Sequence, residues 1–238
     1  MATAQLAVPK VNNHYCFSED SMGKLEQLMH PHHFQAGSII FHEGDAADHL
    51  YYIRSGRVKE TKLSDEGRDY VFSVYHAGDF FGQFDPFGDS KQNFSARAVE
   101  NCEIGVIPKH DLEILLWRDS NLAIDFMQWM AYMQRLARTK FRDLMMYGKL
   151  GALCSTLIRL ANSYGIRRGE AIQIPLKLTN SELAEYIGCT RESVNRMLGE
   201  LKRAGAVSTR GGLITILDLK CLQQICRCED CPVQLCRI

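Results

Sequence analysis

The 238-residue chain has no long hydrophobic run, since no stretch approaches the roughly 18 apolar residues that a membrane-spanning helix needs. Its start, MATAQLAVPKVNNHY, has no basic segment followed by an apolar run, so no secretory signal is expected. With hydrophobic residues at 46% and charged residues at 24%, the chain is also too apolar to be disordered. We therefore expect one or two folded domains without a membrane span.

Net charge and recognisable catalytic groups are absent as well. We find no paired carboxylates, no nucleophile beside a base and no loop that would cradle a phosphate, so we expect no enzyme. The zero net charge hides a split. Acidic residues outnumber Lys and Arg by five in residues 1–147, and Lys and Arg outnumber acidic residues by five in residues 148–238. The basic last third is compatible with a nucleic-acid partner.

Cysteine is abundant and unevenly placed. Five of the nine cysteines lie in the last 18 residues, at Cys221, Cys226, Cys228, Cys231 and Cys236. Without an export signal they indicate a reducing compartment, the cytoplasm, where thiols bind metal or stay free. The last three have the spacing C-x2-C-x4-C, which lets neighbouring thiolates converge. Soft sulfur ligands favour zinc or an iron–sulfur cluster, so the tail is a candidate metal site.

The first half of the chain predicts an antiparallel sheet structure. Short β-favouring runs, separated by glycine-bearing turns, cover residues 38–41, 50–53, 58–63 and 70–75. Such regular spacing is typical of an antiparallel sandwich or a small barrel.

A long helix is predicted next, because residues 120–146 contain neither glycine nor proline. Its apolar residues recur in steps of three and four, at Phe126, Met130, Met133, Ala137 and Leu144. We interpret this seam as a homodimer contact that resembles a coiled coil. The alternative is a helix buried within one chain.

A helix-turn-helix is the clearest local motif. Thr179 is followed three residues later by a glutamate, the spacing of a capping box, which predicts a helix over residues 181–187. Gly188 then allows a tight turn, because glycine adopts left-handed dihedral angles at low cost. Thr190 caps a second helix over residues 191–203.

Polar residues at the start of these helices are predicted to contact DNA, because the first turns of a recognition helix enter the major groove. Arginine can donate two hydrogen bonds to guanine, and glutamate accepts one from cytosine. The predicted DNA-contacting residues are Asn180, Ser181, Arg191, Glu192, Asn195 and Arg196. A hairpin over residues 207–216 would form the wing. The alternative is a merely solvated helix face with a Glu192–Arg196 pair.

Three motifs resemble the CRP/FNR family of transcription regulators. They are GCTRESVNR at residues 188–196, G-x5-LYYI-x2-G at residues 44–56 and GDFFG at residues 78–82. The resemblance implies an α+β fold with an N-terminal antiparallel, cupin-like β-roll, a long dimerisation helix and a C-terminal winged helix-turn-helix. The implied divisions are residues 1–118 for the β-roll, 119–147 for the dimerisation helix, 148–220 for the DNA-binding domain and 221–238 for a cluster-binding tail.

The resemblance also implies a homodimer that binds an inverted-repeat promoter site and contacts RNA polymerase. Arg191 matches the CRP branch, whereas Glu192 and Arg196 are common to both branches, so a TGTGA-like half-site is implied rather than TTGAT. In the CRP branch a glutamate and an arginine–serine pair bind cyclic AMP in the β-roll. Here Gln83 and Asn93 replace them, which removes the charge-assisted phosphate contact. We therefore expect no cyclic AMP and no cofactor in the β-roll.

The cysteine tail resembles that of the Bacillus-type FNR, which implies a 4Fe–4S cluster rather than zinc. The implied ligands are Cys228, Cys231, Cys236 and an aspartate near the end of the dimer helix, Asp143. Cys226 stays open as an alternative fourth ligand, although only one residue separates it from Cys228.

These inferences predict an oxygen-responsive regulator, mainly an activator, of anaerobic respiration and fermentation genes. It would be active with an intact cluster and inactive once oxygen destroys it. One rival is a family member gated by another small ligand in the β-roll, with zinc structuring the tail. A rival of another class is an iron–sulfur electron carrier, which the winged helix opposes.

Overall fold

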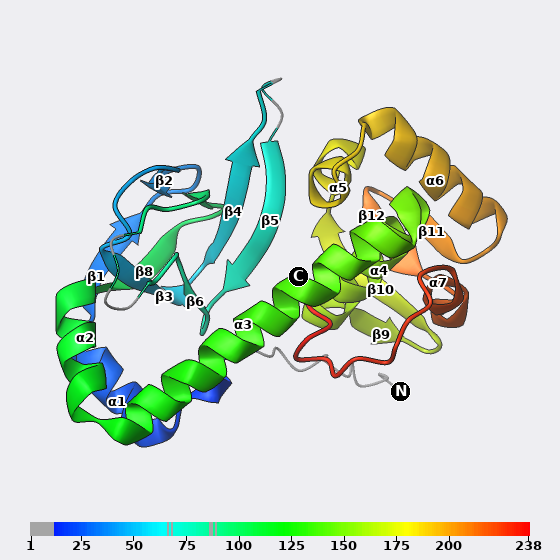
Figure 1. Cartoon of the computed structure of the whole chain (residues 1–238). Coiled ribbons are helices and arrows are strands. Elements are labelled where there is room, and N and C mark those ends of the chain that lie inside the picture. Colours follow the sequence, from blue (N-terminus) through cyan, green and yellow to red (C-terminus); the bar gives the residue numbers. More distant parts are fainter. Residues whose placement is uncertain (1–11, 66, 68, 86–87, 89) are drawn as a thin grey trace, which may run out of the picture. The chain divides into compact units, whose positions relative to one another are not determined.

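The structure is a computed structural model that describes residues 12–65, 67, 69–85, 88 and 90–238. It divides into two compact units, residues 12–134 and residues 135–238. Figure 1 shows α3, Ser120–Met146, as one continuous helix that belongs partly to each unit. No helix in the described ranges is long and apolar enough to span a membrane.

The first unit is a β-roll of two four-stranded antiparallel sheets, with strand orders β1-β8-β3-β6 and β2-β7-β4-β5. One core cluster draws residues such as Ile53 and Ile104 from the first sheet and Val58 and Tyr75 from the second, so the sheets pack face to face. The strands are β1 His30–Phe34, β2 Ile39–Phe41, β3 His49–Ser55, β4 Arg57–Leu63, β5 Asp69–His76, β6 Phe80–Phe81, β7 Ser95–Ala98 and β8 Cys102–Pro108.

Three short helical segments accompany the β-roll: η1 Asn13–Cys16, α1 Glu19–Gln27 and α2 Lys109–Arg118. The first half of α3 packs on the same unit through aromatic side chains. Phe126 lies 5.3 Å from Phe84, and Trp129 lies 6.2 Å from Phe80 of β6, measured between ring centroids. The backbone N–H of Ser18, the residue that caps α1, donates to Asp125 of α3 at 2.9 Å.

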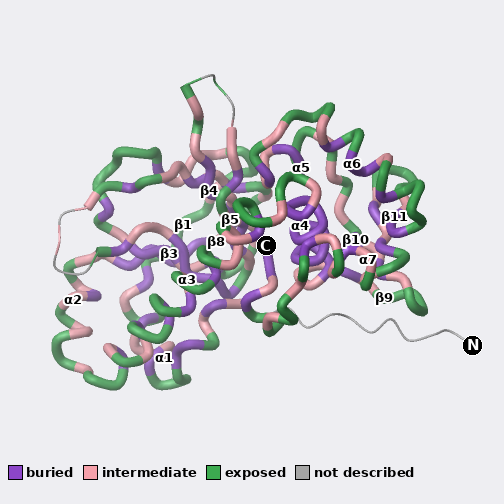
Figure 2. The backbone as a smooth tube through the Cα atoms, turned by 45° about the vertical axis from the view of Figure 1, so that its right-hand side comes forward, coloured by how far each residue is buried: buried purple, intermediate pink, exposed green. Residues whose placement is uncertain are grey.

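The second unit contains the winged helix. Its sheet has the strand order β11-β12-β10-β9. Figure 2 shows α4 as a largely buried helix within this unit, because all residues from Gly151 to Ala161 are buried. The elements are α4 Gly148–Tyr164, β9 Ile166–Arg168, β10 Ala171–Lys177, α5 Asn180–Ile187, α6 Arg191–Arg203, β11 Val207–Arg210, β12 Leu213–Ile216 and α7 Leu219–Ile225.

The predicted α+β class is confirmed, and the long helix has the predicted bounds. The predicted seam on α3 needs correction. Phe126 is 3% exposed, and Met133 packs against the β-roll core, so neither lies on a free face. Met130 and Leu144 of the predicted seam are exposed, and Met127 and Phe141 are further exposed apolar side chains of α3. Packing against the β-roll therefore removes Phe126 and Met133 from the free seam.

Candidate DNA interface and metal centre

The turn between α5 and α6 is built by local contacts. Thr179 and Glu182 form the predicted capping box: the Thr179 side chain accepts from the Glu182 N–H at 3.1 Å, and the Glu182 carboxylate accepts from the Thr179 N–H at 2.7 Å. Gly188 ends α5 with φ at 62°, the left-handed region that glycine enters without strain. Thr190 caps α6 by accepting from the Ser193 N–H at 3.3 Å.

The second helix of the motif, α6, has two distinct faces. Its buried face consists of Val194, Met197, Leu198 and Leu201. Its exposed first turns carry Arg191, Glu192, Asn195 and Arg196, the predicted base-reading residues. A polar, exposed start on a helix held by an apolar face is the geometry with which a recognition helix enters the major groove.

The start of α5 lies beside this face. The side-chain amide of Asn180 donates to the Asn195 carbonyl oxygen at 3.3 Å, which joins two predicted DNA-contacting residues 15 positions apart. Ser181 is exposed next to them. The fold thus brings the polar residues of both helices into one candidate DNA interface.

The cysteine-rich tail begins at α7. The helix ends at Cys226, and the Cys228 N–H donates to the Gln223 carbonyl oxygen at 2.8 Å. Arg227 and Asp230 then have φ angles of 45° and 48°, in the region that costs a non-glycine residue free energy. Strained backbone of this kind concentrates at functional sites, and here it lies on both sides of Cys228, with Asp230 inside the C-x2-C spacing.

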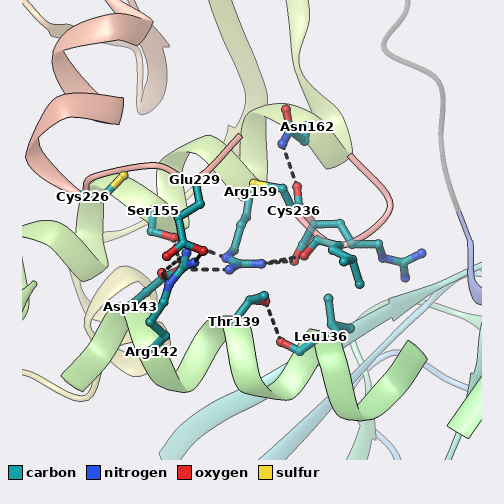
Figure 3. A network of polar contacts seen from close by, with 12 residues as sticks. Leu136, Thr139, Arg142, Asp143, Ser155, Arg159, Asn162, Cys226, Glu229 and Cys236 are labelled. Carbon is teal, nitrogen blue, oxygen red and sulfur yellow. Dashed lines mark hydrogen bonds and ion pairs between the residues drawn. The ribbon is translucent and has the colours of Figure 1, made fainter. Parts of the chain in front are cut away.

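Asp143, on the last turn of α3, is only 4% exposed. Its Oδ1 accepts from the Nε and Nη2 atoms of Arg142 at 3.2 and 2.8 Å. Its Oδ2 accepts from Nη2 of Arg159 at 2.8 Å and from the Ser155 hydroxyl. Burial alone would raise the pKa of this carboxyl, but the bonds from Arg159, Ser155 and Arg142 outweigh it and lower the pKa. Asp143 is therefore a carboxylate in a buried polar network (Figure 3).

The tail thiols lie close to this network. Burial raises the pKa of the Cys236 thiol, and Arg159 opposes that rise electrostatically. Cys228, Cys231 and Asp143 are near enough to raise it further. The other three predicted ligands thus lie within electrostatic range of Cys236. Because buried thiols resist ionisation, they need a cationic partner such as a metal to become thiolates.

Cys226, the alternative ligand, is 4% exposed. Burial, followed by the charges of Cys228 and Asp143, raises the pKa of its thiol to about 11. Its sulfur donates to the Gln223 carbonyl oxygen at 3.6 Å.

Within the described ranges, no three His, Cys, Asp or Glu side chains are arranged around one point where a single metal ion could sit. Each ligand of a 4Fe–4S cluster binds its own iron, so such ligands surround a volume rather than a point. Three thiols and one carboxylate, gathered at the junction of α3 and the tail, fit that donor set. The fit requires one adjustment, because both oxygens of Asp143 already accept two hydrogen bonds each.

The residues that position the predicted ligands, Arg159 and Arg142, were not identified from the sequence. Arg159 is the single charged residue in the buried stretch from Gly151 to Ala161, and a lone arginine in an apolar helix is a signal that was present in the sequence. Arg142 also pairs with Glu229 of the tail. That ion pair has no local sequence signal, because its partners are 87 positions apart.

In the β-roll, Gln83 and Asn93 stand where the CRP branch has its cyclic-nucleotide ligands, and both make backbone hydrogen bonds within the protein. The backbone N–H of Gln83 donates to the Gln92 side chain at 3.0 Å. The carbonyl oxygen of Asn93 accepts from Lys62 at 3.2 Å. The absence of cyclic AMP binding stays a prediction.

Comparison with known proteins agrees with this geometry. Residues 31–119 match the family of cyclic nucleotide-binding domains, and residues 151–225 match Crp-like helix-turn-helix domains. The chain is 38% identical over 223 residues to an anaerobic regulatory protein of Bacillus subtilis, covering 93% of this chain and 94% of that protein. An anaerobic regulatory protein of Haemophilus influenzae is 26% identical over 93% of this chain and 84% of its own.

A solved CRP/FNR family regulator from Thermus thermophilus is 26% identical, with a TM-score of 0.66 over 83% of this chain and 98% of that one. The β-roll, long helix and winged helix define a DNA-binding transcription regulator, which confirms that the chain is not an enzyme. The chain belongs to the CRP/FNR family.

Proposed function

We propose that this regulator responds to oxygen through a 4Fe–4S cluster held by Cys228, Cys231, Cys236 and Asp143 of the 221–238 tail and the dimerisation helix. The observation that carries the proposal is the position of Asp143, which is buried and is joined through Arg159 to the Leu235 carbonyl next to Cys236. The 38% identical relative is itself named an anaerobic regulatory protein, which supports the same assignment.

The regulator would be cytoplasmic and mainly an activator of anaerobic respiration and fermentation genes, active with an intact cluster and inactive once oxygen destroys it. As a homodimer it would bind a TGTGA-like inverted repeat and contact RNA polymerase. The exposed apolar seam on α3, which includes Met127, Met130 and Phe141, supports the dimer.

When bound, the cluster supplies an oxygen-labile link among its ligands. Asp143 belongs to α3, and the tail follows α7 of the DNA-binding domain. Shared ligation would therefore add an oxygen-labile link between the domain and the dimer helix to the link that Arg159 and Asp143 make without metal. Two recognition helices must lie about 34 Å apart to enter successive major grooves. Asn180 and Asn195 would then face DNA in the correct register with the second half-site.

The test is purification without oxygen, followed by an absorption spectrum and by iron and sulfide analysis. We expect a brown protein that bleaches in air and retards DNA carrying a TGTGA-like inverted repeat only before bleaching. Cys228→Ala should lose the iron and the DNA binding but keep the dimer. The control Cys16→Ala, which removes a buried thiol of the β-roll unit, should keep the iron, the DNA binding and the dimer.

The iron content of the Asp143→Ala and Cys226→Ala variants identifies the fourth ligand, because the variant that lacks this ligand loses iron. A colourless oxygen-free preparation with full affinity for the inverted repeat would overturn the proposal.

A further inference from the structure

Three side chains of α4 hold the backbone of the tail on both sides of Cys236. Nη1 of Arg159 donates to the Leu235 carbonyl oxygen at 2.9 Å, and the Asn162 amide donates to the Cys236 carbonyl oxygen at 2.7 Å. The Ile238 N–H donates to the Ser163 hydroxyl at 3.1 Å. These bonds involve no metal ligand side chain, so they can hold the tail in the metal-free protein.

The same arginine also reaches the end of α3. Its Nη2 donates to Asp143 at 2.8 Å, while its Nε donates to the Ser155 hydroxyl at 3.3 Å. One guanidinium, only 4% exposed, thereby joins Asp143 on α3 to the backbone beside Cys236 (Figure 3). Only arginine offers five N–H donors in a rigid planar fork, so no other side chain could serve these acceptors together.

We propose that Arg159 is a positioning residue that holds Asp143 and Cys236 together both before and after metal binding. The inference rests on the proposed function, since it treats both residues as ligands. Of the two donors to Oδ2 of Asp143, the Ser155 hydroxyl can turn away by a single bond rotation. Ser155 is therefore the donor that would free a lone pair for iron, and Arg159 would stay in place as the cation that offsets the buried negative charge.

A consequence is that cluster loss leaves the tail docked. Arg159 keeps its bonds to the Leu235 carbonyl and to Asp143 without iron, and the Arg142–Glu229 ion pair adds a second attachment. The site then remains assembled for reloading, rather than having to be rebuilt from a detached segment.

The test uses hydrogen exchange by mass spectrometry on the metal-free, reduced full-length protein. The backbone N–H groups of Leu235 and Cys236 donate to the Pro232 carbonyl oxygen, and that of Ile238 donates to the Ser163 hydroxyl of α4, so all three should be protected in the wild type. Arg159→Gln should speed their exchange about tenfold or more. Arg159→Lys keeps the charge but lacks the fork, and should speed it nearly as much. The control Arg168→Gln makes the same charge change at an exposed position on β9 and should have no effect.

A second measurement is anaerobic iron and sulfide loading of the same variants. Arg159→Lys should need about tenfold more iron for half-loading, because partners of metal ligands typically change affinity by 10- to 100-fold. Unchanged tail exchange in Arg159→Lys would overturn the inference, as would an unprotected tail in the wild type. If the wild type takes up no iron while tail protection still depends on Arg159, the positioning role stands and the proposed cluster fails.

Discussion

The guanidinium of Arg159 and the carboxylate of Asp143 meet at 2.8 Å, and each residue is 4% exposed. Sixteen positions separate them in the chain, on two different helices. A charge pair this deeply buried stabilises a fold only while both partners are present, because removing either leaves an unpaired charge in a medium that solvates it poorly.

Asp143→Leu should therefore destabilise the metal-free protein by about 3–5 kcal/mol, whereas Asp143→Leu combined with Arg159→Met should recover most of that loss. Urea unfolding under reducing conditions measures both free energies. Equal losses in the single and the double variant would show that the two charges do not depend on one another.

The free seam of α3 predicts how the dimer is held. Met127→Glu would place two carboxylates in the interface and should weaken dimerisation about 100-fold, which is roughly 3 kcal/mol. Sedimentation velocity as a function of concentration measures the change. Leu63→Glu is the matched control, since Leu63 on β4 is exposed to the same extent, 61%, and should leave the dimer intact. If Leu63→Glu were monomeric while Met127→Glu stayed dimeric, the dimer interface would not lie on this face of α3.

The exposed start of α6 predicts which residue reads sequence. Arg191→Ala should cost about 1–3 kcal/mol of binding to the preferred site and relax the preference at one base pair. Competition binding with a set of singly substituted half-sites, at one fixed salt concentration, measures the preference. Arg203→Ala, at the other end of the same helix, should leave the order of preference unchanged. An unaltered order in the Arg191 variant would remove Arg191 from base reading.

A buried tyrosine predicts the behaviour of the β-roll at alkaline pH. Tyr75 donates to Glu60 at 2.9 Å, and burial, followed by the Glu60 charge, raises the pKa of Tyr75 well above 10. The unfolded state therefore ionises first, so stability present below pH 10 is lost as the pH rises beyond it. Tyr75→Phe should make the decline of unfolding free energy shallower by up to about 1.4 kcal/mol per pH unit. If the unfolding free energies of the wild type and of Tyr75→Phe declined in parallel between pH 9 and 11, Tyr75 would not be the source of the pH dependence.

The sequence predicted the helix-turn-helix because its signals are local. Thr179 and Glu182 are three residues apart, Gly188 is needed where the chain turns, and the apolar positions of α6 repeat within two turns. Each signal acts through backbone groups that are neighbours in the chain, so no distant partner is required. The C-x2-C-x4-C spacing is equally local, although it left zinc and a cluster both open.

The face of α3 was less predictable, because Phe126 and Met130 are equally apolar in the sequence. Their exposure differs because Phe126 packs among aromatic side chains of the first unit, whereas Met130 stays exposed. The short helices α2 and α7 also escaped prediction, since stretches of 10 and 7 residues carry too few turns for a clear periodic signal.

The sequence alone determined the reading helix and the thiols of the tail, because each depends on contacts within a few residues, and the resemblance of three motifs to the CRP/FNR family supplied the class of fold. Only the tertiary structure decided that one arginine should join the tail to the long helix. The Leu235 carbonyl is 76 positions from Arg159. Such a bond forms when packing of α4 and α7 brings distant segments together, and its energy depends on burial that no short stretch of sequence can specify.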